Sequence, residues 1–334
     1  MKAIRVNDLY KTYPRNVEAV RGVSFEVEAG EIFGLLGPNG AGKSTTIRIL
    51  VTLSEATKGS VEVGGLKVSE DPWAVRRRIG YVAQASGVDP MDTGRENLVF
   101  QGKLFGLPKK KIDQRVDELL DLFQLQEAAE RKVRTYSGGM KRRLDVALGL
   151  LHEPEILFLD EPTTGLDPES RFVMWEELKR QSAENGLTIL ITTHYLEEAD
   201  QMVDRLAIID QGKIVGEGTP EALKNNLQGD MISLRLVEPE RLMEAQTALA
   251  ELAEIDAPMI DGKTLYAQVG RGEQALPRVL AVLEKSKLAM THIAISRPSL
   301  DKVYLSMTGH AFQAPIPMEA EGDPKSLPAK GELS

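Results

Sequence analysis

The feature that most constrains this chain is a glycine-rich segment at 37–45, which matches the pattern G-x-x-x-x-G-K-[ST] from Gly37 to Ser44. An apolar stretch at 32–36 precedes it and a stretch of helical character at 45–50 follows it. This is the strand, loop and helix context that the pattern requires. A chance glycine-rich turn is the alternative, and the flanking strand and helix argue against it.

The segment is suited to binding the phosphates of a nucleotide. Glycines let the backbone fold tightly, so that successive N–H groups and the helix N-terminus face phosphate oxygens. We expect Lys43 to reach the β- and γ-phosphates and the Ser44 hydroxyl to bind Mg²⁺. The complete expected phosphate loop consists of Gly37, Pro38, Asn39, Gly40, Ala41, Gly42, Lys43, Ser44 and Thr45.

A second element follows at 156–161, which reads Ile-Leu-Phe-Leu-Asp-Glu. Four apolar residues before two acids predict a buried strand that ends at a polar edge, and ligands of parallel sheets bind beyond the carboxyl ends of strands. We expect Asp160 to hold Mg²⁺, directly or through water. Glu161 is expected to face the γ-phosphate and to orient or deprotonate the attacking water. An acidic pair on the surface is the alternative.

A third element, Tyr-Ser-Gly-Gly-Met at 136–140, precedes a helical run at 144–151. Ser137, Gly138 and Gly139 would lie at a helix N-terminus, which is a second anion-binding device. The element resembles the signature of ATP-binding-cassette (ABC) ATPases, usually Leu-Ser-Gly-Gly-Gln, with Tyr136 and Met140 as replacements. Two phosphate cradles for one nucleotide are explained if the second cradle serves a partner subunit.

The resemblance to ABC ATPases covers roughly residues 1–225 and implies further site residues. Gln84 matches the glutamine that links magnesium to the membrane partner, and Asp167, in Gly-Leu-Asp-Pro, lies in the loop that meets the opposite subunit. His194 matches the switch histidine that senses the γ-phosphate. Tyr13 is placed where the family stacks an aromatic ring on adenine, and Tyr10 is a rival for that role. The resemblance thus implies ATP and Mg²⁺ as cofactors, with Lys43, Glu161 and His194 in catalysis.

Composition limits the other classes of function. The net charge of −9 argues against a nucleic-acid partner, and the absence of cysteine excludes disulfides and thiolate metal sites. We find neither a run of about 18 apolar residues nor a signal-peptide core. A peripheral protein on the cytoplasmic side of the inner membrane is therefore expected.

The hydrophobic pattern predicts an α/β fold in two domains. Residues 1–227 would form the P-loop ABC ATPase domain, a RecA-like core with an antiparallel β subdomain and a helical subdomain near 93–126 that carries the signature. Residues 230–309 would form a small α+β domain of order β-α-β-β-α-β, which suggests a ferredoxin-like sandwich. This domain is read as a packing module or as a dimerisation or regulatory clamp. The tail at 311–334 is expected to be disordered.

Three segments, at 135–140, 193–200 and 298–310, resemble those of daunorubicin-resistance-type ATP-binding subunits. The resemblance implies an ATPase that forms a head-to-tail dimer with a second copy of itself. It also implies export of a drug, antibiotic or lipid-like molecule through a separately encoded permease, docked near Gln84 and the 85–93 loop. An importer's ATPase and a soluble non-transport ABC ATPase remain alternatives. The sequence does not identify the transported molecule, because the residues that contact it would belong to the permease.

Overall fold

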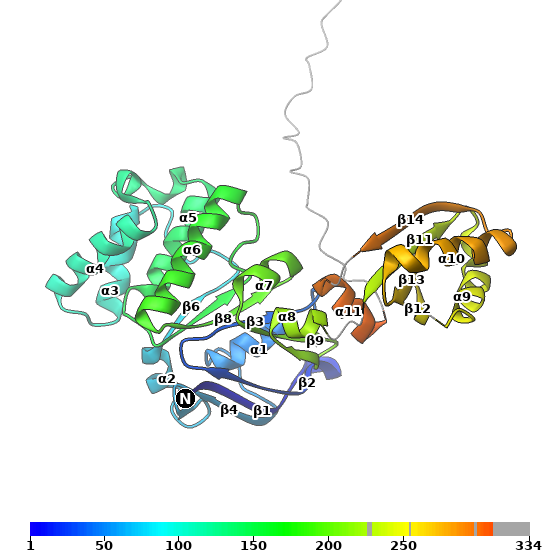
Figure 1. The fold of residues 1–334 in the computed structure, drawn as a ribbon. Coiled ribbons are helices and arrows are strands. Elements are labelled where there is room, and N and C mark those ends of the chain that lie inside the picture. Colours follow the sequence, from blue (N-terminus) through cyan, green and yellow to red (C-terminus); the bar gives the residue numbers. More distant parts are fainter. Residues whose placement is uncertain (226–228, 254, 297–298, 310–334) are drawn as a thin grey trace, which may run out of the picture.

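The computed structural model of the protein describes residues 1–225, 229–253, 255–296 and 299–309. These residues form a large body built on two sheets and a smaller body near the end of the chain (Figure 1). The expected tail at 311–334 and the expected domain boundary at 227 lie outside the described residues.

A six-stranded sheet forms the centre of the large body, in the order β10-β9-β3-β8-β7-β6. Only the edge pair of β9 and β10 is antiparallel. The apolar stretches expected at 32–36 and 156–159 are in two inner strands of this sheet, β3 and β7. Its strands are β3 (Ile32–Leu36), β6 (Ile79–Val82), β7 (Ile156–Asp160), β8 (Thr188–Thr193), β9 (Arg205–Asp210) and β10 (Lys213–Gly218).

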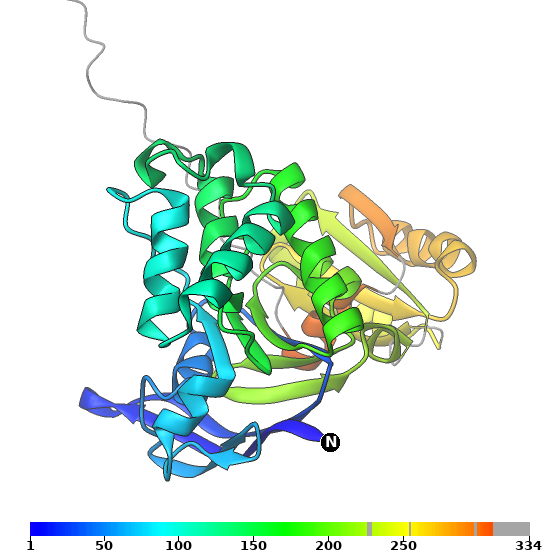
Figure 2. The ribbon, with the colours of Figure 1, turned by 90° about the vertical axis from the view of Figure 1, so that its left-hand side faces the viewer.

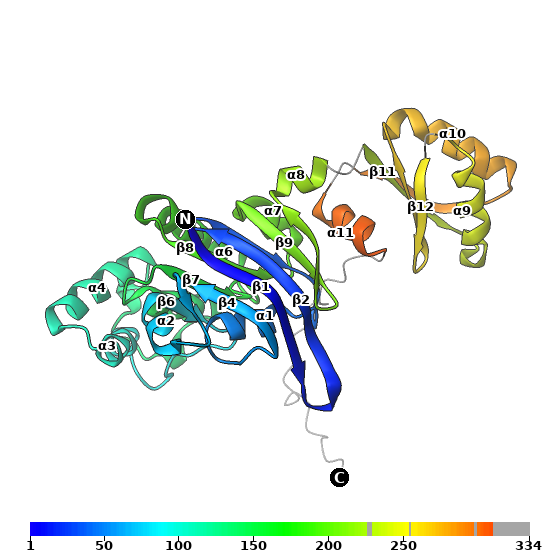
Figure 3. The same ribbon diagram turned by 90° about the horizontal axis from the view of Figure 1, so that it is seen from below.

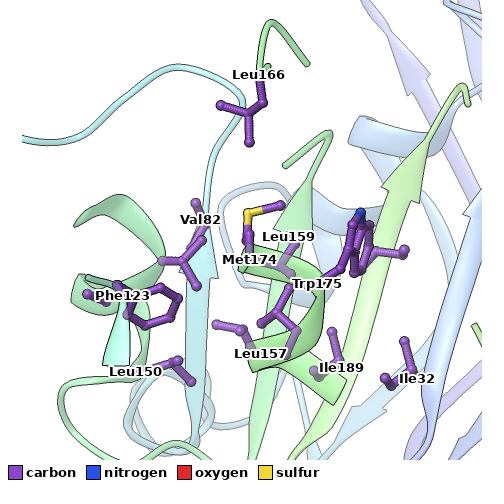
Figure 4. Close-up of a cluster of buried hydrophobic side chains, with 14 of the residues drawn as sticks. Ile32, Val82, Phe123, Leu150, Leu157, Leu159, Leu166, Met174, Trp175 and Ile189 are labelled. Carbon is purple, nitrogen blue, oxygen red and sulfur yellow. The ribbon is translucent and has the colours of Figure 1, made fainter. Parts of the chain in front are cut away.

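Both faces of the central sheet are buried. Successive side chains of a strand point to opposite sides, so each strand contributes to two cores. On one face, Leu157 and Ile189 join a core with Trp175 (Figure 4). On the other face, Phe33 and Phe158 join a second core. The helices that contribute buried side chains to the first core include α5 (Gly138–Leu150), α6 (Pro168–Asn185) and α7 (Leu196–Met202), whereas α1 (Lys43–Leu50) contributes to the second.

The helical region expected at 93–126 consists of α3 (Gly94–Leu104) and α4 (Lys109–Leu122). Thr93 begins α3 with a capping box, since its side chain accepts from the Glu96 N–H and the Glu96 carboxylate accepts from the Thr93 N–H. Figure 2 shows these helices grouped with α5 and α6, above the blue strands of a second sheet. Their buried side chains belong to the first core.

The second sheet is antiparallel and has the order β2-β1-β4-β5. The strands β1 and β2 form a long hairpin (Figure 3) whose pairing continues through several register shifts. Buried side chains of this sheet pack with α1 in the second core. The elements are β1 (Lys2–Tyr13), β2 (Val17–Glu28), β4 (Lys58–Val63) and β5 (Leu66–Lys67), followed by α2 (Pro72–Arg78).

The small body is an α+β sandwich with its own core, which includes Leu234, Leu265 and Val279. Its antiparallel sheet has the order β12-β13-β11-β14, which confirms the predicted β-α-β-β-α-β arrangement. The elements are β11 (Asp230–Leu236), α9 (Leu242–Ala250), β12 (Ile255–Asp261), β13 (Thr264–Val269), α10 (Gly272–Lys285) and β14 (Met290–Ser296).

The last described helix, α11 (Leu300–Thr308), returns from the sandwich to the large body, where it lies near α8 (Pro220–Asn225) (Figure 1). Val303 and Tyr304 are buried in the first core, and the Tyr304 hydroxyl donates to Asp210 Oδ1 at 2.9 Å. The range 230–309, which we expected to form one separate domain, therefore ends in a helix that packs on the cassette. The structure differs from the expectation because the apolar face of α11 packs into the first core, beside α7 and β10.

Candidate active site

The sheet order brings the predicted motifs together. β3, β8, β7 and β6 are parallel neighbours, so the segments after their carboxyl ends meet at one edge of the sheet. β3 leads into the glycine-rich loop, β7 ends at Asp160, and β8 is followed by His194. β6 is followed two residues later by Gln84. The structure therefore brings these predicted residues close together.

The glycine-rich loop is held closely against its neighbours. A Cβ atom at Gly37 would lie 2.2 Å from the Ile209 carbonyl oxygen, and one at Gly42 would lie 2.5 Å from that of Ala19. Gly42 also has φ +108°, a conformation that favours glycine. The loop then opens into α1 at Lys43. Only glycine fits at these two positions, which are the two glycines required by the pattern G-x-x-x-x-G-K-[ST].

The remaining loop residues range from exposed to buried. Asn39 and Gly40 are exposed at its tip, whereas Pro38 and Thr45 are partly buried. The Ala41 N–H donates to the Pro38 carbonyl oxygen, and the Ala41 oxygen accepts from the Gly212 N–H. These hydrogen bonds attach the base of the loop to the turn after β9. The exposed tip at Asn39 and Gly40 remains accessible to a ligand.

Lys43 is buried, and its ammonium group donates to the carbonyl oxygens of Gly37 at 2.7 Å and Pro38 at 3.1 Å. Burial lowers the pKa of Lys43, and the carboxylates of Glu161 and Asp160 oppose that shift. A cation held among backbone oxygens and two acids inside the loop is positioned to attract anionic phosphate oxygens.

Asp160 accepts two hydroxyl hydrogen bonds on the same oxygen. Ser44 Oγ donates to Asp160 Oδ1 at 3.0 Å, and Thr192 Oγ1 donates to it at 2.6 Å. A hydroxyl and a carboxylate side by side are hard oxygen donors, which Mg²⁺ prefers together with water and phosphate ligands. In the described part of the chain, no group of three or more His, Cys, Asp or Glu side chains forms a metal site. In nucleotide sites the protein supplies only a few of the Mg²⁺ ligands, and phosphate and water supply the rest. Ser44 and Asp160 fit this smaller set of protein ligands.

Glu161 is the point on which the site converges. Its Oε1 lies 3.6 Å from Lys43 Nζ, and its Oε2 lies 3.2 Å from His194 Nδ1. The Gln84 amide donates to the same Oε2 at 3.2 Å. Glu161 has φ +47°, a left-handed conformation rare for residues other than glycine, and its N–H donates to the Thr192 side chain and carbonyl oxygen. Strain of this kind persists where the surrounding structure fixes a functional group.

Arg142 is a site-supporting residue that sequence reasoning missed. Its guanidinium is buried and donates to the carbonyl oxygens of Asp160, Pro162 and Ala83. It therefore joins the end of β7 to the segment that carries Gln84, and burial lowers its pKa. The sequence feature that could have indicated this role is an arginine within the amphipathic pattern of α5, four residues after Gly138.

The expected second anion cradle lies at the start of α5. Ser137 is the N-cap, and its Oγ accepts from the Met140 N–H at 3.2 Å. A Cβ atom at Gly139 would lie 2.2 Å from Ser170 Oγ, so the helix start packs against α6, while a Cβ at Gly138 would meet nothing within 4 Å. Tyr136, which replaces the usual leucine, is buried and donates to the Ala128 carbonyl oxygen at 2.7 Å.

Asp167 and the two candidate adenine-stacking tyrosines complete the predicted set. Asp167 is the N-cap of α6, and hydrogen bonds from Ser170 hold its pKa below the ordinary value. Tyr13 ends β1, and the Lys11 ammonium lies 5.2 Å from the centre of its ring. The Tyr10 hydroxyl instead lies against Gly22 of β2, 2.9 Å from the position of a Cβ there.

Comparisons with known proteins agree with this geometry. Residues 20–164 match the family model described as ABC transporter. The chain is 44% identical to the daunorubicin/doxorubicin resistance ATP-binding protein DrrA of Streptomyces peucetius, over 92% of this chain and 93% of the relative. It is 40% identical to the Nod factor export ATP-binding protein I of Burkholderia lata, over 90% and 97% of the two chains.

A solved structure of similar fold is the dimeric post-hydrolysis state of an ATP-binding cassette bound to ADP and Pi. It has a TM-score of 0.60 and 26% identity, and the match covers 65% of this chain and 98% of that one. The protein is thus a P-loop ATPase of the cassette type. It belongs to the family of ATP-binding proteins of ABC transporters.

Proposed function

We propose that this chain powers the export of a drug, antibiotic or lipid-like molecule through a separately encoded membrane permease. The observation that carries the ATPase part is the convergence of Lys43, Gln84 and His194 on Glu161. Export is supported by similarity, over nine-tenths of the chain, to proteins named for drug resistance and for export.

In the proposed reaction, Lys43 and the N–H groups of the glycine-rich loop bind the β- and γ-phosphates of ATP. Glu161 orients the attacking water and accepts its proton, and His194 holds the carboxylate and senses the γ-phosphate. Ser44, Asp160 and Gln84 would hold Mg²⁺, which supplies a positive charge on the phosphate oxygens when bound. Tyr13 would stack on adenine.

We further propose that the working unit is a head-to-tail dimer of two copies of this chain. The start of α5 presents Ser137, Gly138 and Gly139 beside Asp167, the N-cap residue of α6. A Cβ atom at Gly139 would lie 3.3 Å from Asp167 Oδ2. A helix N-terminus attracts a phosphate, so this cradle would bind the γ-phosphate held by the partner. ATP then favours the closed dimer, because it contacts both copies only in that state.

The surface around the 85–93 loop would receive the permease. Gly87 and Gln101 line a groove of about 200 Å³ beside this loop. Phe100 and Leu104, one turn apart on α3, are 60% and 66% exposed, and Met91 of the loop before α3 is 62% exposed. In the described residues no helix is both long and apolar enough to cross a bilayer. We propose peripheral attachment to the cytoplasmic face of the membrane through this surface.

The sandwich at 230–296 would regulate the cassette or help it to dimerise. It has a separate core, and α11 links it back to the cassette. Lys302 of α11 lies 4.5 Å from the Tyr266 ring of β13, so the helix contacts both bodies.

Transport in inverted membrane vesicles tests the proposed function. Vesicles that contain this chain and its permease should accumulate doxorubicin when ATP is added outside, where the ATPase is exposed. Vesicles with the Glu161→Gln variant should not. ATP hydrolysis without ATP-dependent movement of any tested drug or lipid analogue would argue against export, and ATP-driven loss of preloaded compound from the vesicles would indicate an importer.

A further inference from the structure

A polar cluster of two buried and two partly buried residues, outside the hydrolytic site, joins the switch segment to the loop before α6. We define the switch cluster as Thr163, Arg171, Tyr195 and Glu198. Glu198, on α7, is 7% exposed, and a buried carboxylate is costly unless it is paired. Thr163 Oγ1 donates to Glu198 Oε2 at 2.6 Å, and Arg171 Nε forms an ion pair with Oε1 at 3.2 Å. Both carboxylate oxygens therefore have specific partners.

These partners lie on either side of the loop before α6: Thr163 at its start and Arg171 in the helix that follows it. Thr163 is 1% exposed and lies two residues after Glu161. Arg171 lies in the first turns of α6, whose N-cap is Asp167, and its Nη2 donates to the Leu166 carbonyl oxygen at 3.4 Å. The carboxylate of Glu198 thus holds both ends of the 163–167 loop.

The same cluster touches the switch histidine. The Arg171 guanidinium lies 5.2 Å from the centre of the Tyr195 ring, and that ring lies 4.2 Å from the ring of His194. α7 begins directly after Tyr195, so Glu198 is fixed to His194 by one turn of helix. A displacement of His194 by bound nucleotide would move the carboxylate that holds the loop.

We infer that Glu198 is a positioning residue that couples His194 to the 163–167 loop. Through Thr163 and Arg171 it keeps Glu161, His194 and Asp167 in one arrangement, and it transmits the state of one nucleotide site to the surface that faces the other. The inference rests on the proposed dimer with shared sites. Glu198 touches no reacting atom, and its role is confined to the placement of groups that do.

ATP hydrolysis by matched variants tests this inference. Glu198→Ala and Thr163→Val should each lower kcat by about ten- to a hundredfold, as expected for misplaced reacting groups, with the Kd for ATP unchanged and the Hill coefficient reduced toward one. The double variant should lose no more than the worse single one, because both remove the same contact. Glu198→Gln, which can still accept from Thr163, should recover part of the loss. Glu197→Gln, on the exposed neighbouring residue, is the control and should behave like wild type.

Wild-type kcat and Hill coefficient in Glu198→Ala would overturn the inference, and so would additive losses in the double variant or an equal loss in Glu197→Gln. If Glu198→Ala does not fold, as judged by its thermal unfolding, Thr163→Val decides by the same criteria. Failure of the dimer proposal is seen separately, as a Glu161→Gln protein that stays monomeric in ATP on size-exclusion chromatography. If Glu161→Gln dimerises and Thr163→Val has no effect on kcat or on the ATP concentration needed for dimerisation, only the coupling inference is wrong.

Discussion

The ammonium group of Lys43 and the carboxylate of Glu161 lie 3.6 Å apart and are 4% and 8% exposed. The ammonium also donates to two carbonyl oxygens of its own loop. A buried ion pair contributes little net stability, since desolvation offsets attraction. Its value here is geometric, because it keeps Glu161, the proposed base, beside Lys43, the proposed phosphate ligand.

Replacing Glu161 by Gln should keep ATP binding and nearly abolish turnover. The amide retains the size of the side chain but cannot accept a proton from water. The variant should accumulate as an ATP-bound dimer on size-exclusion chromatography, while phosphate release falls by at least about a hundredfold. Glu155→Gln, at an exposed carboxylate, is the control. Hydrolysis at the wild-type rate would exclude Glu161 as the base.

Tyr13→Ala should weaken nucleotide binding, whereas Tyr10→Ala should leave it near normal. The Tyr13 ring lies at the end of β1, and the Tyr10 hydroxyl is packed against Gly22. Stacking on adenine is worth roughly 1 kcal/mol, so Kd should rise about fivefold. Titration with a fluorescent ATP analogue measures both values. The reverse order would assign the adenine site to Tyr10.

Much of the site could be predicted because its residues follow strands in fixed patterns. The apolar strand before Asp160 and the glycines around Lys43 are local patterns that can be recognised without knowledge of distant contacts. Parallel pairing of β3, β8 and β7 then brings them together. The β-α-β-β-α-β order was also predictable, and buried side chains alternate with less buried ones over most of β11 and β13.

Other features depend on contacts between distant segments, which periodicity does not reveal. The three carbonyl oxygens bound by Arg142 come from two segments far apart in the sequence, the end of β7 with the residues after it and the segment after β6. The return of α11 to the cassette depends on the fit of Tyr304 beside Asp210, and the local pattern gives only its apolar face. The strands β1 and β2 are each 12 residues long because their pairing continues through register shifts.

His152 should make stability depend on pH in a defined direction. Its Nε2 lies 2.9 Å from the Ile79 carbonyl oxygen, its ring stacks on Phe105, and burial lowers its pKa. In the unfolded chain a histidine has a pKa of about 6.5. As pH falls below that value, the unfolded state takes up a proton that the folded state does not, so stability decreases.

In His152→Gln this part of the pH dependence should disappear, because the amide can still donate to the Ile79 oxygen but does not titrate. Thermal unfolding between about pH 7.5 and pH 5.5 measures the effect, and Tm should fall less steeply than in the wild type. His292→Gln, at an exposed histidine, is the control. An unchanged slope in His152→Gln would show that the ring is not a buried neutral group.

Complementation between two inactive variants tests whether each nucleotide is shared by two subunits. Lys43→Ala should disable the glycine-rich loop of its own chain. Ser137→Arg should disable the site of the partner, because it places charge and bulk at the start of α5. Each variant alone should hydrolyse little ATP. A heterodimer of the two has one site with both defects and one with none.

If one intact site can turn over, the mixture should regain up to about a quarter of the wild-type activity. Random pairing makes half of the dimers mixed, and each mixed dimer has one of its two sites intact. Recovery would be hard to explain with self-contained sites. Since the two sites can depend on each other, a lack of recovery is followed by crosslinking between cysteines placed at Ser137 and Asn39, a cysteine-free chain being suited to this. ATP-dependent crosslinks between chains are expected, and their complete absence would contradict the shared-site dimer.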